Sequence, residues 1–194
     1  NQNDRHCAVQ DIIDAGHISM IPSLIKAPIS PSFKIQAIDC LWKNELLFSE
    51  NVNLLGSLDS VIIDDPKRIN TLKINNFKTD INFLIGQLFH TDFNRCYKSM
   101  KELQKHSSDE VLYHLNRNWS RAKIDYGALY FFINAYKFLL ERGSYDKSIV
   151  KKIDFLLSDN WPNFMKFKSS AIQVEGCLND TKLDNYFIKF SNEM

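Results

Sequence analysis

Apolar residues recur at helical spacing along most of this chain. Between residues 79 and 105 they follow the 3.6-residue period of one helix face, at Ile81, Leu84, Ile85, Leu88, Cys96, Met100 and Leu103. We therefore expect one long helix from Asp80 to about Lys105. Similar segments, most with their own start or stop signals, predict further helices at about residues 9–13, 18–25, 31–48, 107–119, 126–142, 145–157, 162–178 and 183–190.

The segment 126–142 is apolar almost all round, which predicts a central, buried helix. Asn134 lies within it. Because a buried amide needs hydrogen-bond partners, we expect Asn134 to fix the register of the helix rather than to perform catalysis. Ser30 before Pro31 reads as a helix N-cap. The short loops predict that sequential helices pack as antiparallel neighbours.

Residues 49–78 are the least helical part of the chain. Residues 60–63 and 69–74 could form two short strands around the turn signal Asp64-Asp65-Pro66. We therefore predict an all-α fold, either an irregular multi-helix bundle or a short α-solenoid-like stack, with a small β-hairpin or irregular excursion near residues 60–75. We expect one helical domain over 1–194, with 1–58, 59–78 and 79–194 as its subdivision.

Composition indicates a packed protein, since 44% of the 194 residues are hydrophobic and 12% are aromatic. No apolar stretch reaches the roughly 18 residues of a membrane span. The four cysteines are scattered without a CxxC pair, and three lie on or near apolar stripes, so we expect buried thiols rather than disulfides. These features predict a cytoplasmic location. The abundance of Asn, Lys and Ile suggests a bacterium or phage.

The net charge of +1 conceals an uneven distribution, with −5 over residues 1–65, +6 over 66–124 and zero over 125–194. A basic ridge, which we define as Arg95, Lys98, Lys101 and Lys105, falls on one side of the predicted long helix, and Arg117 and Arg121 follow one helix later. Such a ridge is interpreted as a solvated face, as a contact for an acidic protein, or as a contact for nucleic acid phosphates.

No local sequence motif indicates a particular reaction. The five histidines never pair at a spacing of three or four residues, which argues against a metal site on one helix. Phosphate-binding glycine loops and the GxSxG nucleophile motif are absent from the sequence. We therefore predict no catalytic residue, no metal ligand and no cofactor, although an enzyme site assembled from scattered residues stays open.

The N-terminal third resembles an armadillo or HEAT repeat over residues 13–44. The resemblance is carried by Ile13-Asp14-Ala15-Gly16-His17-Ile18, Ile21, Leu24-Ile25, a Pro/Ser turn, and Ile35, Ala37, Leu41-Trp42 and Asn44. These residues are similar to the short helix, glycine, helix, turn and long helix of such repeats. The resemblance implies an α-solenoid-like stack that recognises proteins along an extended surface.

These features together favour a non-enzymatic protein-binding protein, namely an adaptor, an inhibitor or a toxin-neutralising immunity protein that acts by occluding a surface. The expected partner is another protein with an acidic surface, and we expect no membrane. A nucleic-acid-associated protein that uses the basic region 95–123 is the alternative. The predicted contact residues are Arg95, Lys98, Lys101, Lys105, Arg117, Arg121, Asp64, Asp65, Lys67 and Arg68.

Overall fold

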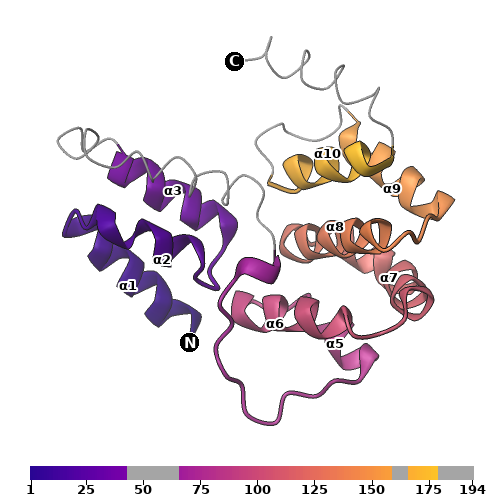
Figure 1. Ribbon diagram of the computed structural model, residues 1–194, viewed down its shortest axis with the longest axis horizontal. Helices are drawn as coiled ribbons and strands as arrows, with labels where there is room; N and C mark the ends of the chain where they lie inside the picture. The colour runs from indigo at the N-terminus through magenta and orange to yellow at the C-terminus, as the bar shows by residue number, and fades with distance from the viewer. Residues whose placement is uncertain (43–65, 159–165, 179–194) are drawn as a thin grey trace. The chain divides into compact units, whose positions relative to one another are not determined.

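The computed structural model describes residues 1–42, 66–158 and 166–178, and within these ranges every regular element is a helix (Figure 1). The predicted all-α class is confirmed. None of the described helices is both long and apolar enough to cross a membrane. The chain divides into two compact units, of which the first comprises residues 1–77 and 90–101, and the second comprises residues 78–89 and 102–194.

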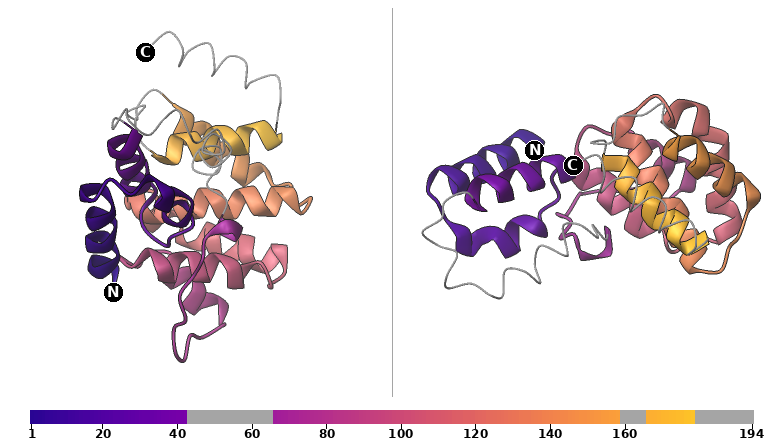
Figure 2. Two further views of the ribbon diagram at one scale, coloured as in Figure 1. Left: turned by 60° about the vertical axis from the view of Figure 1, so that its left-hand side comes forward. Right: turned by 90° about the horizontal axis from the view of Figure 1, so that it is seen from above.

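The first unit begins with three α-helices and a short 3-10 helix, α1 (Gln2–Asp14), η1 (Ile18–Met20), α2 (Ile21–Ile25) and α3 (Pro31–Trp42). Helix α3 packs against both α1 and α2 (Figures 1 and 2). Their shared core consists of Val9, Ile18, Ile21, Leu24, Ile25, Ile29, Ala37 and Ile38. Gly16 takes a φ of 65° between α1 and η1, a conformation that glycine adopts without strain.

Helix α3 starts where the sequence predicts. The backbone N–H of Phe33 donates to Ser30 Oγ over 3.1 Å, so Ser30 caps the helix that Pro31 opens. The predicted continuation to residue 48 lies outside the described residues. The order of helix, glycine, helix, turn and helix matches the layout of the armadillo/HEAT-like pattern, and membership of that repeat class stays a prediction.

The predicted single helix over residues 80–105 is wrong, because the chain breaks it into α5 (Ile81–Gln87) and α6 (Phe93–Leu103). Asp92 starts the second helix, since its carboxylate accepts the backbone N–H of Asn94 over 2.9 Å. The backbone N–H of Asp92 itself donates to His90 Nδ1 over 2.8 Å. These side chains satisfy backbone groups that a continuous helix would pair, so a new helix begins at this point.

The second strand of the predicted hairpin is also absent. After the 3-10 helix η3 (Pro66–Arg68), residues 69–80 contain no strand, while residues 60–65 lie outside the described residues. Side chains of α6 satisfy the backbone there, because Lys101 Nζ donates to the carbonyl of Ile69 over 2.6 Å and the N–H of Leu72 donates to Asn94 Oδ1 over 2.7 Å. The segment needs no partner strand at these positions.

The second unit contains α5 and the stack of α7 (Ser108–Ala122), α8 (Tyr126–Glu141), α9 (Lys147–Leu157) and α10 (Lys166–Leu178). Helix α8 lies between α7 and α10, and α10 also packs on α9 (Figure 1). Nearly every residue from Ala128 to Leu139 is buried, which confirms α8 as the predicted central helix. The predicted helix over 183–190 lies outside the described residues.

Asn134 is buried in α8 and donates through Nδ2 to the carbonyl of Tyr130, one turn earlier, over 2.9 Å. Its partner therefore belongs to its own helix. The four cysteines form no disulfide, as expected. Their expected burial holds only for Cys96, because Cys7, Cys40 and Cys177 are exposed.

Candidate functional site

The basic ridge is partly bound to its own chain. Arg95, Lys98 and Lys101 lie on α6 and are half-buried, whereas Lys105 follows the end of that helix and is exposed. Lys98 Nζ lies 5.1 Å from the centroid of the Phe77 ring, and Lys101 Nζ binds the carbonyl of Ile69. Lys105 pairs with Glu102 over 2.7 Å. Lys98, Lys101 and Lys105 therefore already have partners within the protein.

The other predicted contact residues are spread over both units. Lys67 and Arg68 are exposed on η3, while Asp64 and Asp65 lie outside the described residues. Arg117 and Arg121 are exposed on α7, and the guanidinium of Arg121 lies 3.9 Å from the centroid of the Phe89 ring.

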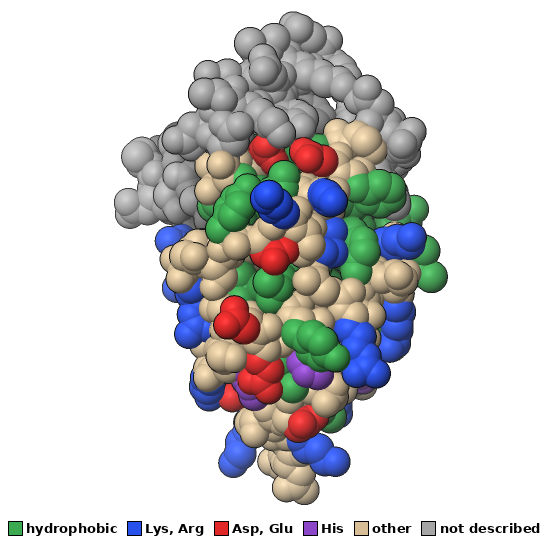
Figure 3. All heavy atoms as spheres, turned by 90° about the vertical axis from the view of Figure 1, so that its right-hand side faces the viewer, with side chains coloured by type: hydrophobic (Ala, Val, Ile, Leu, Met, Phe, Trp, Pro, Cys, Tyr) green, Lys and Arg blue, Asp and Glu red, His purple; other side chains and the backbone are tan. Residues whose placement is uncertain are grey.

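One face of the molecule shows how the surface charge is arranged. There, Lys and Arg side chains alternate with Asp, Glu and hydrophobic side chains (Figure 3). No single sign of charge dominates this face. The contact role of the ten predicted residues stays a prediction.

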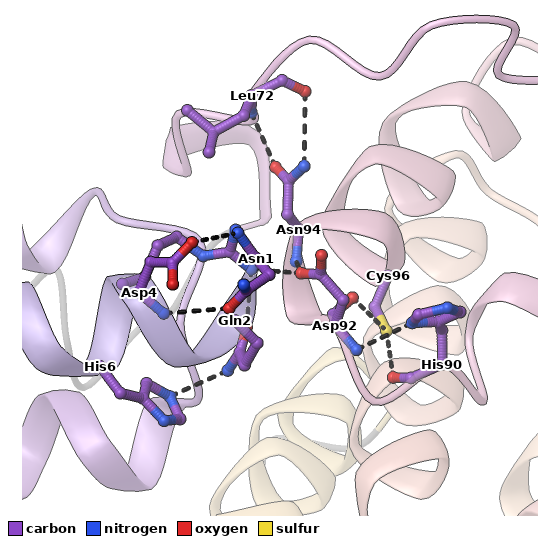
Figure 4. A network of polar contacts seen from close by, with 10 residues as sticks. Asn1, Gln2, Asp4, His6, Leu72, His90, Asp92, Asn94 and Cys96 are labelled. Atoms are coloured by element: carbon purple, nitrogen blue, oxygen red, sulfur yellow. Dashed lines mark hydrogen bonds and ion pairs between the residues drawn. The ribbon is translucent and has the colours of Figure 1, made fainter.

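A polar network in the first unit joins the start of α1 to the start of α6 (Figure 4). The Arg5 guanidinium forms an ion pair with Asp92, and Arg5 also donates to Gln2 Oε1 over 2.8 Å. Asn94 accepts the backbone N–H of Leu72 and donates to the carbonyl of the same residue. Asp92 thus caps α6 and binds α1 at once, which gives this network a structural role.

A second polar group lies in the second unit, among α7, α8 and α9. We call it the Lys152 cluster, and its members are Asn116, Trp119, Tyr136, Ser148 and Lys152. Lys152 Nζ donates to Asn116 Oδ1 over 2.7 Å and to the carbonyl of Ser148 over 3.1 Å. The same nitrogen lies 5.7 Å from the centroid of the Trp119 ring and 5.5 Å from that of Tyr136.

Each helix positions its part of this cluster through ordinary packing. Tyr136 is fully buried on α8, where its ring lies 6.1 Å from that of Trp119 between centroids. Ser148 stands in the first turn of α9, and its hydroxyl accepts a hydrogen bond from Asn116 Nδ2 over 3.2 Å. Asp146 caps α9 by accepting the backbone N–H of Ser148 over 2.6 Å.

The pKa shifts in this region follow from burial and hydrogen bonding. Burial raises the pKa of the Tyr136 phenol, with a smaller contribution from the Asp146 charge, so the hydroxyl stays protonated. Burial lowers the pKa of Lys152, and Asp146 opposes that effect. Hydrogen bonds from Ser148 lower the pKa of Asp146. The neutral phenol and the partly desolvated ammonium are both hydrogen-bond donors.

The Tyr136 hydroxyl is buried and has no hydrogen-bond partner among the described residues. An ammonium carries three N–H donors, and the described residues accept two from Lys152. The cluster therefore offers two donors beside two aromatic rings, an arrangement suited to binding an acceptor group of a ligand. Across the described ranges, no group of three or more His, Cys, Asp or Glu side chains gathers as metal ligands do.

Comparison with known proteins finds that the chain is similar to a bilin biosynthesis protein. Bilin biosynthesis protein CpeY of Synechococcus is 32% identical over 185 residues, which is 94% of this chain and 44% of that protein. The uncharacterized phycocyanin operon protein Y of Pseudanabaena tenuis is 29% identical over 174 residues, which is 86% of this chain and 39% of that protein. The chain thus spans less than half the length of these curated relatives. No family model matches the chain.

These similarities contradict the predicted adaptor, inhibitor or immunity protein. Neither relative's description points to toxin neutralisation or to nucleic acid, so the alternative based on the basic region 95–123 finds no support. The prediction failed because the absence of sequence motifs excludes only those sites whose residues lie close together in the sequence. Side chains from separate helices can build a site that no spacing reveals.

Sequence reasoning missed every member of the Lys152 cluster as a site residue. One signal was present, because Lys152 occupies a position of the apolar stripe that α9 forms with Ile149, Ile153 and Leu156. A lysine on a core-facing stripe must place its ammonium against polar or aromatic groups. The partners on α7 and α8 carried no comparable signal, since their approach depends on tertiary packing.

Proposed function

We propose that the protein takes part in bilin biosynthesis. The observation that carries this proposal is the 32% identity to a bilin biosynthesis protein across 94% of the chain. The match extends over both compact units, so it does not rest on one repeat-like stretch. The chain spans only 44% of that relative, and the proposal therefore concerns a step that this part can perform.

We infer that this step is the binding of a bilin. A bilin is a linear tetrapyrrole with a conjugated chain of pyrrole rings and acidic propionate groups. Aromatic side chains contact such rings, and cations bind carboxylates. The described part of the chain combines both, since Lys152 lies against the rings of Trp119 and Tyr136.

Titration of the purified chain with biliverdin, followed by visible absorbance and circular dichroism, tests this function. Biliverdin in solution has no fixed handedness, whereas a protein-bound bilin adopts one twist. We expect a saturable shift of its absorbance and an induced circular dichroism signal at micromolar concentrations. The same titration in concentrated guanidinium chloride is the control, because the unfolded chain lacks the helical stack. A spectrum identical with and without folded protein would reject bilin binding.

A second proposal concerns a protein partner, which we infer to be a phycocyanin-type protein. It is supported by the similarity to a phycocyanin operon protein and by the armadillo/HEAT-like resemblance over residues 13–44, since such repeats bind proteins. The exposed cations Lys67, Arg68 and Arg117 could contact an acidic partner. We infer the cytoplasm as the compartment, in keeping with four cysteines that form no disulfide.

Co-elution of the chain with purified phycocyanin subunits tests the partner. We expect a complex at low salt that weakens as the salt concentration rises, because screening reduces attraction between exposed charges. Replacing Lys67, Arg68 and Arg117 together by Gln should weaken the complex further. Separate elution at low salt would exclude this partner.

A further inference from the structure

The Lys152 cluster has the features of a ligand site rather than of a closed structural contact. Its ammonium is half-buried, and the described residues accept two of its three N–H donors. Asn116 and Trp119, which flank it, are also half-buried, so the cluster is partly open to solvent. Asp146 accepts the backbone N–H of Ser148 at the start of α9, and its charge also acts on Lys152 and Tyr136.

Tyr136 supplies a second, independent observation. Its hydroxyl is fully buried and finds no acceptor or donor among the described residues. A polar group left in that state destabilises a fold by about 1–3 kcal/mol, and phenylalanine would remove the penalty at little cost in packing. Proteins that keep such a group often use it at a functional site.

We propose that Lys152 and Tyr136 hold a propionate carboxylate of the bilin, with Trp119 in contact with the neighbouring pyrrole ring. This inference rests on the proposed function and assigns its substrate contacts. Both groups are donors, so they fit an acceptor, and the positive charge of Lys152 selects an anionic one. Because the Tyr136 hydroxyl is buried in the unliganded protein, the proposal requires the side chains that cover it to move aside on binding.

The charge contact is tested by titrating the wild-type chain and Lys152→Gln with biliverdin and with biliverdin dimethyl ester, which lacks the carboxylates. We expect Lys152→Gln to weaken biliverdin binding about tenfold or more. The ester should bind the wild type weakly and be insensitive to the substitution. Lys151→Gln is the matched control, since Lys151 is the exposed neighbour on α9. It should bind biliverdin like the wild type.

Lys152→Arg is the control for a structural effect of the substitution. Because arginine keeps the positive charge, we expect Lys152→Arg to bind biliverdin with most of the wild-type affinity. Equal biliverdin affinity in the wild type and Lys152→Gln would overturn this inference and leave bilin binding intact. An equal loss in Lys151→Gln would also overturn it. If the wild type itself binds no biliverdin, the proposed function fails, and this inference fails with it.

The phenol contact is tested by Tyr136→Phe with Tyr130→Phe as its control. Tyr130 lies on the same helix, and its buried hydroxyl likewise lacks a partner among the described residues. We expect Tyr136→Phe to weaken biliverdin binding several-fold without lowering the melting temperature. Tyr130→Phe should leave the affinity unchanged. If Tyr136→Phe binds biliverdin as the wild type does, the phenol has no part in holding the carboxylate.

Discussion

The hydroxyl of Tyr136 is buried inside the helix stack and has no hydrogen-bond partner among the described residues. Burial raises the pKa of this phenol, so it stays neutral and cannot gain a charge interaction at any physiological pH. Its ring packs beside Trp119 and under the Lys152 ammonium, and those contacts do not need the hydroxyl. At this residue the aromatic ring stabilises the fold, whereas the buried hydroxyl destabilises it.

Tyr136→Phe should therefore raise the free energy of unfolding by about 1 kcal/mol, because it removes an unpartnered buried polar atom and keeps the ring. Urea denaturation of the unliganded chain at neutral pH measures the change. Tyr130→Phe should shift stability in the same direction for the same reason. A loss of stability in Tyr136→Phe would show that the hydroxyl has a stabilising partner in solution.

Individual residues also show how far the sequence could be used. The period of 3.6 residues correctly assigned Asn134 to a buried helix face, because that inference needs only local spacing. Lys152 lay on an equally clear stripe, yet its aromatic partners belong to two other helices. Such a contact depends on how helices pack, which spacing along one helix does not specify.

At the scale of elements, the start of α9 depends on Asp146. Its carboxylate accepts the backbone N–H of Ser148, and hydrogen bonds from Ser148 lower its pKa. A lowered carboxyl pKa stabilises the folded state above the unfolded pKa of about 4. That contribution is lost as the pH falls through the folded pKa, since the protonated group no longer accepts as a charged cap.

Asp146→Ala should cost about 1 kcal/mol at neutral pH, as expected for the loss of an N-cap. Asp146→Asn should cost less, because asparagine also caps helices. Urea denaturation at neutral pH and near pH 3 measures both variants. The difference between the wild type and Asp146→Asn should shrink in acid. A difference that is unchanged across this range would mean that the Asp146 charge adds nothing to the cap.

The two elements that were predicted wrongly from the sequence, a continuous helix and a strand, failed for the same reason. The apolar stripe over residues 81–103 predicts a continuous helix, but Asp92 and His90 bind backbone groups in its middle and divide it into α5 and α6. Residues 69–74 have the composition of a strand, but Lys101 and Asn94 satisfy backbone atoms of Ile69 and Leu72. In both places, side-chain-to-backbone hydrogen bonds override the local pattern.

At the scale of the whole molecule, helix packing is compatible with many functions, and the sequence held no motif to choose among them. The basic ridge was predicted as a contact surface from the positions of its charges in the sequence. In the structure, the Lys98 ammonium lies over the Phe77 ring and Lys101 donates to the carbonyl of Ile69. Part of the ridge is therefore bound within the chain, and the contact role of its residues stays a prediction. The proposal of bilin binding instead starts from the similarity of the chain to a bilin biosynthesis protein.

The two compact units give the bilin proposal a spatial test. All members of the Lys152 cluster belong to the second unit, whereas α1, α2 and α3 belong to the first. A ligand slows amide exchange most where it suppresses local opening. Hydrogen exchange followed by mass spectrometry should therefore show that biliverdin protects α7 and α9 and leaves α1–α3 unchanged.

Lys152→Gln should abolish this protection at the same biliverdin concentration, and Lys151→Gln should retain it. Protection confined to α1–α3 would place the bilin in the first unit and away from the Lys152 cluster. The pattern of protection thus separates the site from the function, because a bilin bound anywhere supports the function. Only a bilin that protects α7 and α9 through Lys152 supports the assigned contacts.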